Sequence, residues 1–168
     1  AGLHRWEHGK VQTWTTRDGL PADYVRALRR DADGTLWVGT LGGGMARMKD
    51  GRFVHITTRE GLVDDVISQI LPDDFGALWL GCNRGIMRVE RHELEALADG
   101  KISELHPMAL GRNEGLLKEQ CFGGTSPTAF KTRDGRLFFP MMGGVTEIDP
   151  RRLQDLATAT PQVRIESF

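Results

Sequence analysis

The side chains that could do chemistry in this sequence are adjacent carboxylates and a few polar residues in glycine-rich surroundings. The carboxylate pairs, of a type that can bind calcium or share a proton, are Asp64–Asp65 and Asp73–Asp74. Asp73 precedes a turn glycine, as Asp31 does 42 residues earlier, and an aspartate at that place caps its own turn. We therefore expect Asp73 to be structural. Asp65, which matches Asp23 at the same spacing, lies in a connecting loop, and both stay candidate ligand-binding residues.

Other polar residues in the expected loops complete the candidate binding set. These are Tyr24, Asn83, Arg84, Lys118, Glu119 and Gln120. Arg84 is the most specific candidate, because the matching turn in the preceding copy of the repeat consists of glycines. Its guanidinium could receive a carboxylate or a sulfate group of a ligand. A solvated surface arginine is the simpler alternative, and the sequence leaves both open.

Signatures of catalysis and of cofactor binding are absent from the sequence. It contains no Gly-x-Ser-x-Gly elbow, no His-Glu-x-x-His zinc helix and no Gly-Lys-Ser/Thr phosphate loop. The five histidines stand apart from one another, so they suggest neither a metal site nor a general base. We expect no enzyme activity, no cofactor and no metal in this chain.

The amino-acid composition gives no support for binding to nucleic acid, membrane or zinc. The formal net charge is −1 with 27% charged residues, which gives no electrostatic basis for nucleic-acid binding. No run of 18 apolar residues occurs, so we expect no direct membrane insertion by this chain. The two cysteines, Cys82 and Cys121, lack Cys-x-x-Cys spacing and do not suggest zinc. A disulfide in an oxidising compartment and two buried thiols both remain open.

An internal repeat of 42 residues organises the chain. "GTLWVGT" at Gly34–Thr40 returns as "GALWLGC" at Gly76–Cys82, and a rougher copy, "GRLFFPM", begins at Gly135. "TTRDGLPADYVRAL" and "TTREGLVDDVISQI" repeat at the same spacing. The third copy carries two insertions, of 12 and 5 residues. The first contains "RHELEALADG", whose apolar spacing predicts a short surface helix near 91–99, and the second contains "KEQCFGG".

Within each repeat the periodicity is that of β-strands. Four short alternating segments with glycine turns between them, in about 42 residues, are typical of a β-propeller blade. We therefore predict an all-β fold, a partial β-propeller of four-stranded antiparallel blades. The expected division is the last two strands of a blade, two full blades and the first three strands of a last blade, at residues 2–15, 23–57, 66–109 and 127–149.

Bulky residues recur at one place on an inner strand of each blade. They are Trp37, Trp79 and Phe138, and we expect all three to be buried between neighbouring blades. Gly39 and Gly81 follow the tryptophans two residues later, and we expect them to leave room for the next blade.

The repeated motifs resemble the two-component regulator propeller family. The resemblance rests on "DGLPADYVRALRRDADGTLWVGTLGGGMARMKDGRF" and "EGLVDDVISQILPDDFGALWLGCNRGIMRV", with Cys82 in place of the usual threonine. "GGTSPTAFKTRDGRLFFPMMGGVTEIDPRRL" resembles a closing repeat, and "PQVRIESF" the start of an immunoglobulin-like domain. The resemblance implies a propeller fragment at 1–160 and the start of that next domain at 161–168. It also implies a sensor region, usually periplasmic, whose parent ends in a histidine kinase, a diguanylate cyclase or a transcription regulator.

The partial blades predict association, because open blades leave apolar faces and strand edges uncovered. We expect two chains to pair head to tail, with the strand at Val11–Thr15 completing the partner's last blade in a six-blade ring. A monomeric arc or another dimer are the alternatives. For function, we expect a non-catalytic sensor region that binds an unidentified small molecule, with carbohydrate as one candidate, or a partner. A dimerisation scaffold without ligand, or a propeller enzyme, remain alternatives.

Overall fold

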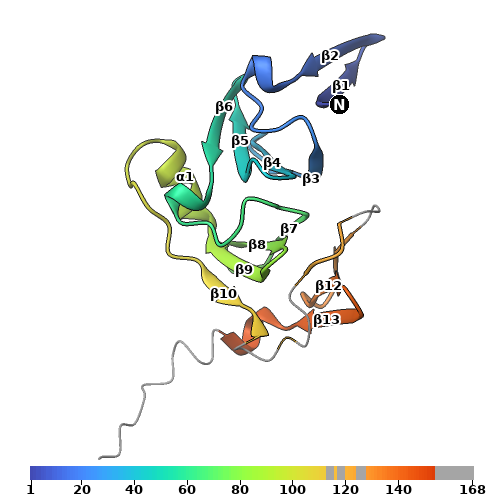
Figure 1. Ribbon diagram of the computed structural model, residues 1–168, viewed down its shortest axis with the longest axis vertical. Helices are drawn as coiled ribbons and strands as arrows, with labels where there is room; N and C mark the ends of the chain where they lie inside the picture. Colours follow the sequence, from blue (N-terminus) through green and yellow to red (C-terminus); the bar gives the residue numbers. More distant parts are fainter. Residues whose placement is uncertain (113–115, 117–119, 124–127, 154–168) are drawn as a thin grey trace, which may run out of the picture.

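The computed structural model has four antiparallel sheets that follow one another in chain order (Figure 1). It describes residues 1–112, 116, 120–123 and 128–153. The first sheet pairs β1 (Leu3–Glu7) with β2 (Lys10–Trp14). The second sheet contains β3 (Val25–Arg30), β4 (Leu36–Thr40), β5 (Met45–Lys49) and β6 (Arg52–Ile56). Each strand in these sheets pairs with its neighbour along the chain.

The third and fourth sheets repeat this order. The third contains β7 (Gln69–Pro72), β8 (Ala77–Cys82), β9 (Gly85–Glu90) and β10 (Met108–Leu110). The fourth contains β11 (Phe130–Lys131), β12 (Leu137–Met141) and β13 (Gly144–Ile148). Helix α1 (Arg91–Ala98) lies between β9 and β10, where the insertion predicted a helix. The fold is thus a partial β-propeller of four-stranded blades, as the repeat predicted.

A capped turn leads out of each of the first two sheets. Short 3-10 helices, η1 (Thr16–Asp18) and η2 (Thr58–Glu60), begin after Thr15 and Thr57, whose side chains and backbones form capping boxes with the acidic residue three positions on. A glycine with positive φ ends both turns. These turns are the "TTRDG" and "TTREG" of the sequence.

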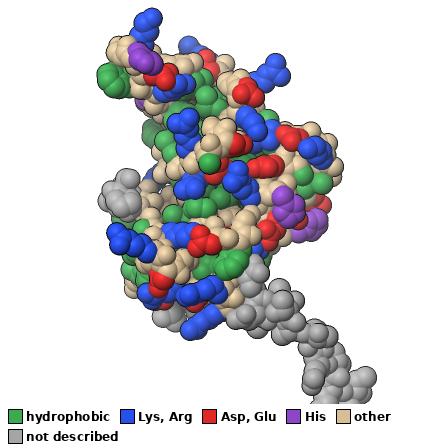
Figure 2. All heavy atoms as spheres, turned by 180° about the vertical axis from the view of Figure 1, so that it is seen from behind, with side chains coloured by type: hydrophobic (Ala, Val, Ile, Leu, Met, Phe, Trp, Pro, Cys, Tyr) green, Lys and Arg blue, Asp and Glu red, His purple; other side chains and the backbone are tan. Residues whose placement is uncertain are grey.

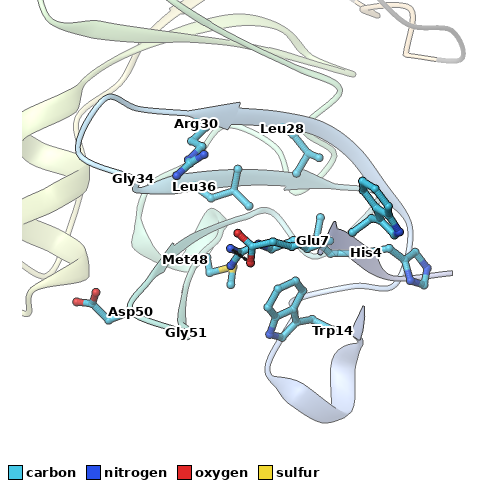
Figure 3. Close-up of a pocket in the computed structure, with 13 residues that line it drawn as sticks. His4, Glu7, Trp14, Leu28, Arg30, Gly34, Leu36, Met48, Asp50 and Gly51 are labelled. Atoms are coloured by element: carbon cyan, nitrogen blue, oxygen red, sulfur yellow. Dashed lines mark hydrogen bonds and ion pairs between the residues drawn. The ribbon is translucent and has the colours of Figure 1, made fainter. Parts of the chain in front are cut away.

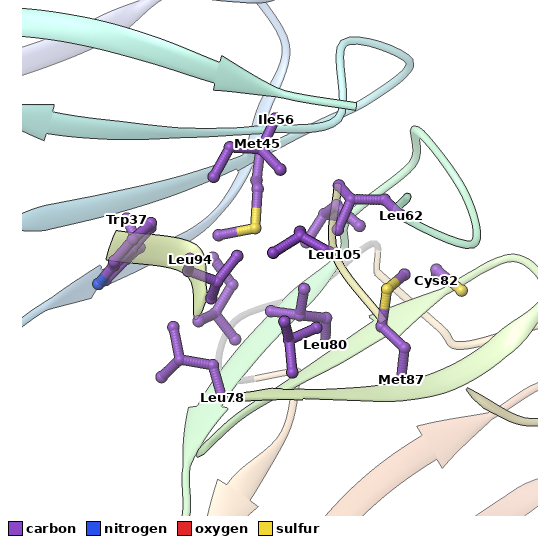
Figure 4. Close-up of a cluster of buried hydrophobic side chains, with 13 residues drawn as sticks. Trp37, Met45, Ile56, Leu62, Leu78, Leu80, Cys82, Met87, Leu94 and Leu105 are labelled. Carbon is purple, nitrogen blue, oxygen red and sulfur yellow. The ribbon is translucent and has the colours of Figure 1, made fainter. Parts of the chain in front are cut away.

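The hydrophobic core lies between sheets rather than within any one of them. Trp37 of the second sheet is fully buried against the third sheet, together with apolar residues of β8 and of α1 (Figure 4). Trp79 is fully buried in the same way against the fourth sheet. The indole Nε1 of Trp37 donates to Asp31 Oδ2 at 2.7 Å, and that of Trp79 to Asp73 Oδ2 at 2.9 Å. The repeated tryptophans therefore fix how consecutive blades stack.

Asp73 also caps its own turn, as predicted. Its Oδ1 accepts hydrogen bonds from the backbone amides of Phe75 and Ala77, both at 2.9 Å. In the fourth sheet the corresponding pair changes together: Thr132 stands where the aspartate stood, and Phe138 replaces the tryptophan. A phenylalanine has no N–H that would need the carboxylate.

The glycines after the tryptophans provide space for the next blade, as predicted. A Cβ on Gly39 would lie 2.8 Å from both the Cγ2 and the backbone oxygen of Ile67. A Cβ on Gly81 would lie 2.1 Å from Gln69 Oε1 and 3.1 Å from Cys121 Sγ. All of these distances are shorter than ordinary van der Waals contact. At Gly39 only glycine lets the chain that enters the next blade approach this closely, whereas the shortest contact at Gly81 is with Gln69 of β7 in the same sheet.

The prediction that Phe138 is buried between blades is wrong. Phe138 has the register of the two tryptophans, opposite Phe130 and Glu147, but it is only half-buried. Its ring stacks on Phe130, which is 52% exposed, with ring centroids 4.9 Å apart. The face of the fourth sheet that Phe138 occupies has no following sheet among the described residues. Phe139 is the fully buried phenylalanine, because it points back toward Trp79.

Arg47 attaches the C-terminal end of helix α1 to the preceding blade. Arg47 of β5 forms an ion pair with Asp99 at 2.7 Å and donates to the carbonyl of Ala98 at 3.3 Å. These contacts satisfy groups at the helix C-terminus, where carbonyls lack partners within the helix. The hydrogen bond from Arg47 is the main reason that the pKa of Asp99 is below its usual value.

The molecular surface mixes both signs of charge. On the face shown in Figure 2, basic and acidic side chains are interspersed, with apolar side chains visible between them. In the part of the chain that the structure describes, no helix has the length and apolar character needed to cross a membrane.

Candidate binding face and groove

One end of the propeller gathers most of the residues that the sequence marked as binding candidates. In the second and fourth sheets, the loop that enters the innermost strand meets the turn between the second and third strands. The amide of Leu41 donates to the carbonyl of Tyr24, and the amide of Met142 to that of Gln120, both at 2.9 Å. We call this end the loop face, and its exposed residues are Tyr24, Leu41, Asn83, Arg84, Gln120, Phe122 and Met142.

Asp23 and Asp65 hold the loops in place. Asp65 Oδ1 accepts from the amide of Thr58 at 2.7 Å, and its Oδ2 accepts from the Thr58 hydroxyl at 3.1 Å. Asp23 Oδ1 accepts from the amide of Thr16 at 2.7 Å, which is the same contact one repeat earlier. The repetition gives both carboxylates a structural role, and ligand binding by them stays a prediction.

Two of the other predicted residues are in direct contact. Gln120 Nε2 donates to Asn83 Oδ1 at 3.3 Å, which joins the turn of the third sheet to the segment leading into the fourth. Arg84 is exposed beside them, and Tyr24, which precedes the first strand of the neighbouring second sheet, is 69% exposed. Lys118 and Glu119 lie outside the described residues.

The apolar residues of the loop face were not predicted from the sequence. Leu41, Phe122 and Met142 are each at least 40% exposed. Leu41 and Met142 hold the turn position that Asn83 holds in the third sheet, directly after the second strand of each blade. An alignment of the three turns would have identified this position, because only Asn83 is polar there.

The segment that carries Gln120 and Phe122 is anchored over the inner strands. The buried Gln69 donates through Nε2 to the carbonyl of Phe122 at 2.9 Å and to that of Thr128 at 2.8 Å. Arg26 Nη1 donates to the carbonyl of Gly123 at 2.6 Å. Residues of two neighbouring blades therefore fix the loop face where the second insertion begins.

A separate groove of about 640 Å³ lies between the first and second sheets (Figure 3). Its walls are β1 with Trp14 on one side and Leu28, Leu36 and Met48 of the second sheet on the other. The first sheet has two strands where the second has four, so the groove occupies the space of the two inner strands. None of the residues predicted to bind a ligand lines it.

Comparison with known proteins agrees with the repeat. Residues 19–42 match the family described as two component regulator propeller. They span the loop that contains Asp23 and the first two strands of the second sheet. This segment carries a regulator propeller repeat. The third sheet repeats the same strands, capped turn and Asp–Trp contact 42 residues later.

Solved structures with the same fold come from B. thetaiotaomicron. The chain aligns over 99% of its length with 22% of the extracellular domain of a protein described as a one component system, at TM-score 0.65 and 18% identity. It aligns over 89% of its length with 25% of an extracellular domain from a hybrid two component system, at TM-score 0.55 and 17% identity. A third match, also described as a hybrid two component system, covers 77% of this chain and 17% of that one, at TM-score 0.57 and 21% identity.

The chain thus spans a quarter or less of these extracellular domains. At this level of identity the likeness establishes the shared fold. No curated protein sequence matches the chain.

Proposed function

We propose that this chain is part of the extracytoplasmic sensor region of a two-component-type signalling protein and is itself non-catalytic. The observation that supports the proposal most is the structural alignment of 99% of the chain with part of one extracellular domain, that of a protein described as a one component system. The regulator propeller repeat supports the same assignment. A periplasmic location and a parent that ends in a histidine kinase, a diguanylate cyclase or a transcription regulator belong to the proposal.

The loop face is the proposed binding surface. It combines exposed apolar and aromatic side chains, Tyr24 and Phe122 among them, with the amides of Asn83 and Gln120 and the guanidinium of Arg84. Aromatic faces stack on sugar rings, amides bond hydroxyls, and a guanidinium pairs with carboxylate or sulfate. An acidic carbohydrate is therefore the ligand class that this surface suits best.

Calorimetric titration with neutral, carboxylated and sulfated oligosaccharides tests the proposed site. We expect an acidic sugar to bind, with Arg84→Ala weakening its affinity about 10-fold or more. Arg133→Ala is the matched control, because Arg133 is an exposed arginine in the turn between β11 and β12, at the opposite end of the blade. Equal loss in both variants, or no binding by any sugar, would contradict a sugar site on the loop face.

Association of two chains is a second candidate role, favoured by the two open ends. The groove beside β1 and the exposed Phe130–Phe138 stack are both uncovered apolar surfaces. For β2 to complete a partner's last blade, β13 would have to replace β1, which pairs with β2 along its whole length. Light scattering across a wide concentration range tests this proposal. A concentration-independent monomer mass would exclude the six-blade ring.

A further inference from the structure

The two cysteines of the chain meet at one point between the third and fourth sheets. Cys82 ends β8, and Cys121 lies 39 residues later in the segment that leads into the fourth sheet. The amide of Cys121 donates to the carbonyl of Cys82 at 3.0 Å. Both Sγ atoms lie 3.3 Å from the same acceptor, the carbonyl oxygen of Gly85. The two thiols therefore occupy one small buried volume.

The preceding blade contains the same contact without cysteine. The amide of Ile67 donates to the carbonyl of Thr40 at 2.9 Å, and the Thr40 hydroxyl donates to the carbonyl of Gly44 at 2.9 Å. Cys82 thus stands in the place of Thr40, and Cys121 in the place of Ile67. The chain has two cysteines, and they replace both members of one contacting pair. A single substitution for packing would not require the second.

We propose that Cys82 and Cys121 form a disulfide that ties the third blade to the fourth. Residues that lie opposite each other on antiparallel strands have Cα atoms about 4.5–5.5 Å apart, inside the roughly 4.4–6.8 Å that disulfides span. Gly81 lies beside the pair, and its missing Cβ keeps the space next to Cys121 Sγ open. The inference rests on the proposed extracytoplasmic location, because disulfides persist in oxidising compartments.

The bond forms by exchange with a disulfide oxidant, either a thiol–disulfide oxidoreductase or oxidised glutathione. One cysteine thiolate attacks a sulfur of the oxidant's disulfide, which forms a mixed disulfide and releases one oxidant thiolate. The second cysteine thiolate then attacks the mixed disulfide, which forms the Cys82–Cys121 bond and releases the other oxidant thiolate. The two cysteines lose two electrons and two protons, and the oxidant is reduced to two thiols.

The order of folding and oxidation follows from burial. Burial, together with the neighbouring Cys82, raises the pKa of the Cys121 thiol to about 12. In the folded chain Cys121 is consequently almost never the thiolate that exchange requires. Oxidation should therefore be fast while the chain folds and at least 100-fold slower once the reduced chain has folded.

The test refolds the reduced chain from denaturant in a glutathione buffer, then alkylates it under denaturing conditions and measures its intact mass. We expect the wild-type chain to add no alkyl groups and to be 2 Da lighter than the reduced chain. The matched controls restore the residues of the preceding blade: Cys82→Thr and Cys121→Ile should each leave one alkylatable thiol. If the wild-type chain keeps two alkylatable thiols after refolding, the disulfide proposal is wrong.

A second measurement separates this proposal from the proposed location. The parent protein is fused to a topology reporter and labelled in intact cells with a thiol reagent that cannot cross membranes. The reporter gives the location of this region, and the labelling gives the state of its cysteines. A reporter outside the cytoplasm with both cysteines still alkylatable after denaturation would overturn the disulfide and keep the location. A cytoplasmic reporter would overturn the location, while refolding in glutathione would still decide whether the geometry supports the bond.

Discussion

Replacing Gly39 with alanine should destabilise the propeller by about 2 kcal/mol. The added Cβ would lie 2.8 Å from the backbone oxygen and from Cγ2 of Ile67, and a backbone atom cannot rotate away. Overpacking of this kind costs about 1–3 kcal/mol. Because the clash involves the main chain, we take the upper part of that range and subtract about 0.7 kcal/mol, the gain from replacing glycine within a strand. A shift of about 2 kcal/mol corresponds to roughly 4–8 °C in Tm at this chain length.

Urea unfolding followed by tryptophan fluorescence measures this effect, because Trp37 and Trp79 are fully buried. Gly144→Ala is the matched control: Gly144 is also a strand glycine, and nothing lies within 4 Å of its added Cβ. We expect the control to change stability by no more than about 0.5 kcal/mol. If Gly39→Ala unfolds at the same urea concentration as the control, the proposed reason for the repeated glycine is refuted.

Three further predictions concern the contacts between and within blades. Asp73→Ala should lower the free energy of unfolding in urea by about 2 kcal/mol, because it leaves the buried Trp79 N–H without an acceptor. Asp73→Asn keeps an acceptor oxygen and should cost less. Equal losses in the two variants would argue against the indole contact. Burial would raise the pKa of Glu60, but hydrogen bonds from Thr57 lower this pKa overall. The ionised Glu60 carboxylate therefore stabilises the fold above its unfolded pKa, and this stabilisation is lost as the pH falls through the folded pKa. Glu60→Gln should accordingly flatten the dependence of the urea midpoint on pH below about pH 5, and an unchanged slope would contradict this. Reduction of the proposed disulfide, which closes a loop of 39 residues, should lower the stability of the chain by about 4 kcal/mol in calorimetry. An unchanged Tm would show that the bond contributes nothing to stability.

The strand order could be predicted from the sequence, because each blade is built from strands that follow one another along the chain. Each strand pairs with its neighbour along the chain, so the alternation around Leu36 and the glycine turns already specified β3 to β6. The 42-residue period then transferred the same assignment to the third sheet. Helix α1 was also predictable, because the apolar spacing of "RHELEALADG" is local information.

The candidate site was less predictable, because its residues come from loops of different blades. The structural role of Asp23 and Asp65 became visible only in their hydrogen bonds to Thr16 and Thr58, and ligand binding by them stays a prediction. The exposure of Phe122 depends on the anchoring of its backbone by Gln69, which is 53 residues away. No pattern within a single loop contains that information.

The sequence by itself determined the blade repeat, the turn glycines and the buried tryptophans, since these follow from periodicity and local backbone chemistry. Only the tertiary structure decided which faces are covered. Phe138 has the position of Trp79 in its strand, yet it is half-buried, because burial depends on whether another sheet follows. Only the tertiary structure, too, placed Cys121 on Cys82: insertions of 12 and 5 residues hide its equivalence to Ile67, and packing between blades restores the contact.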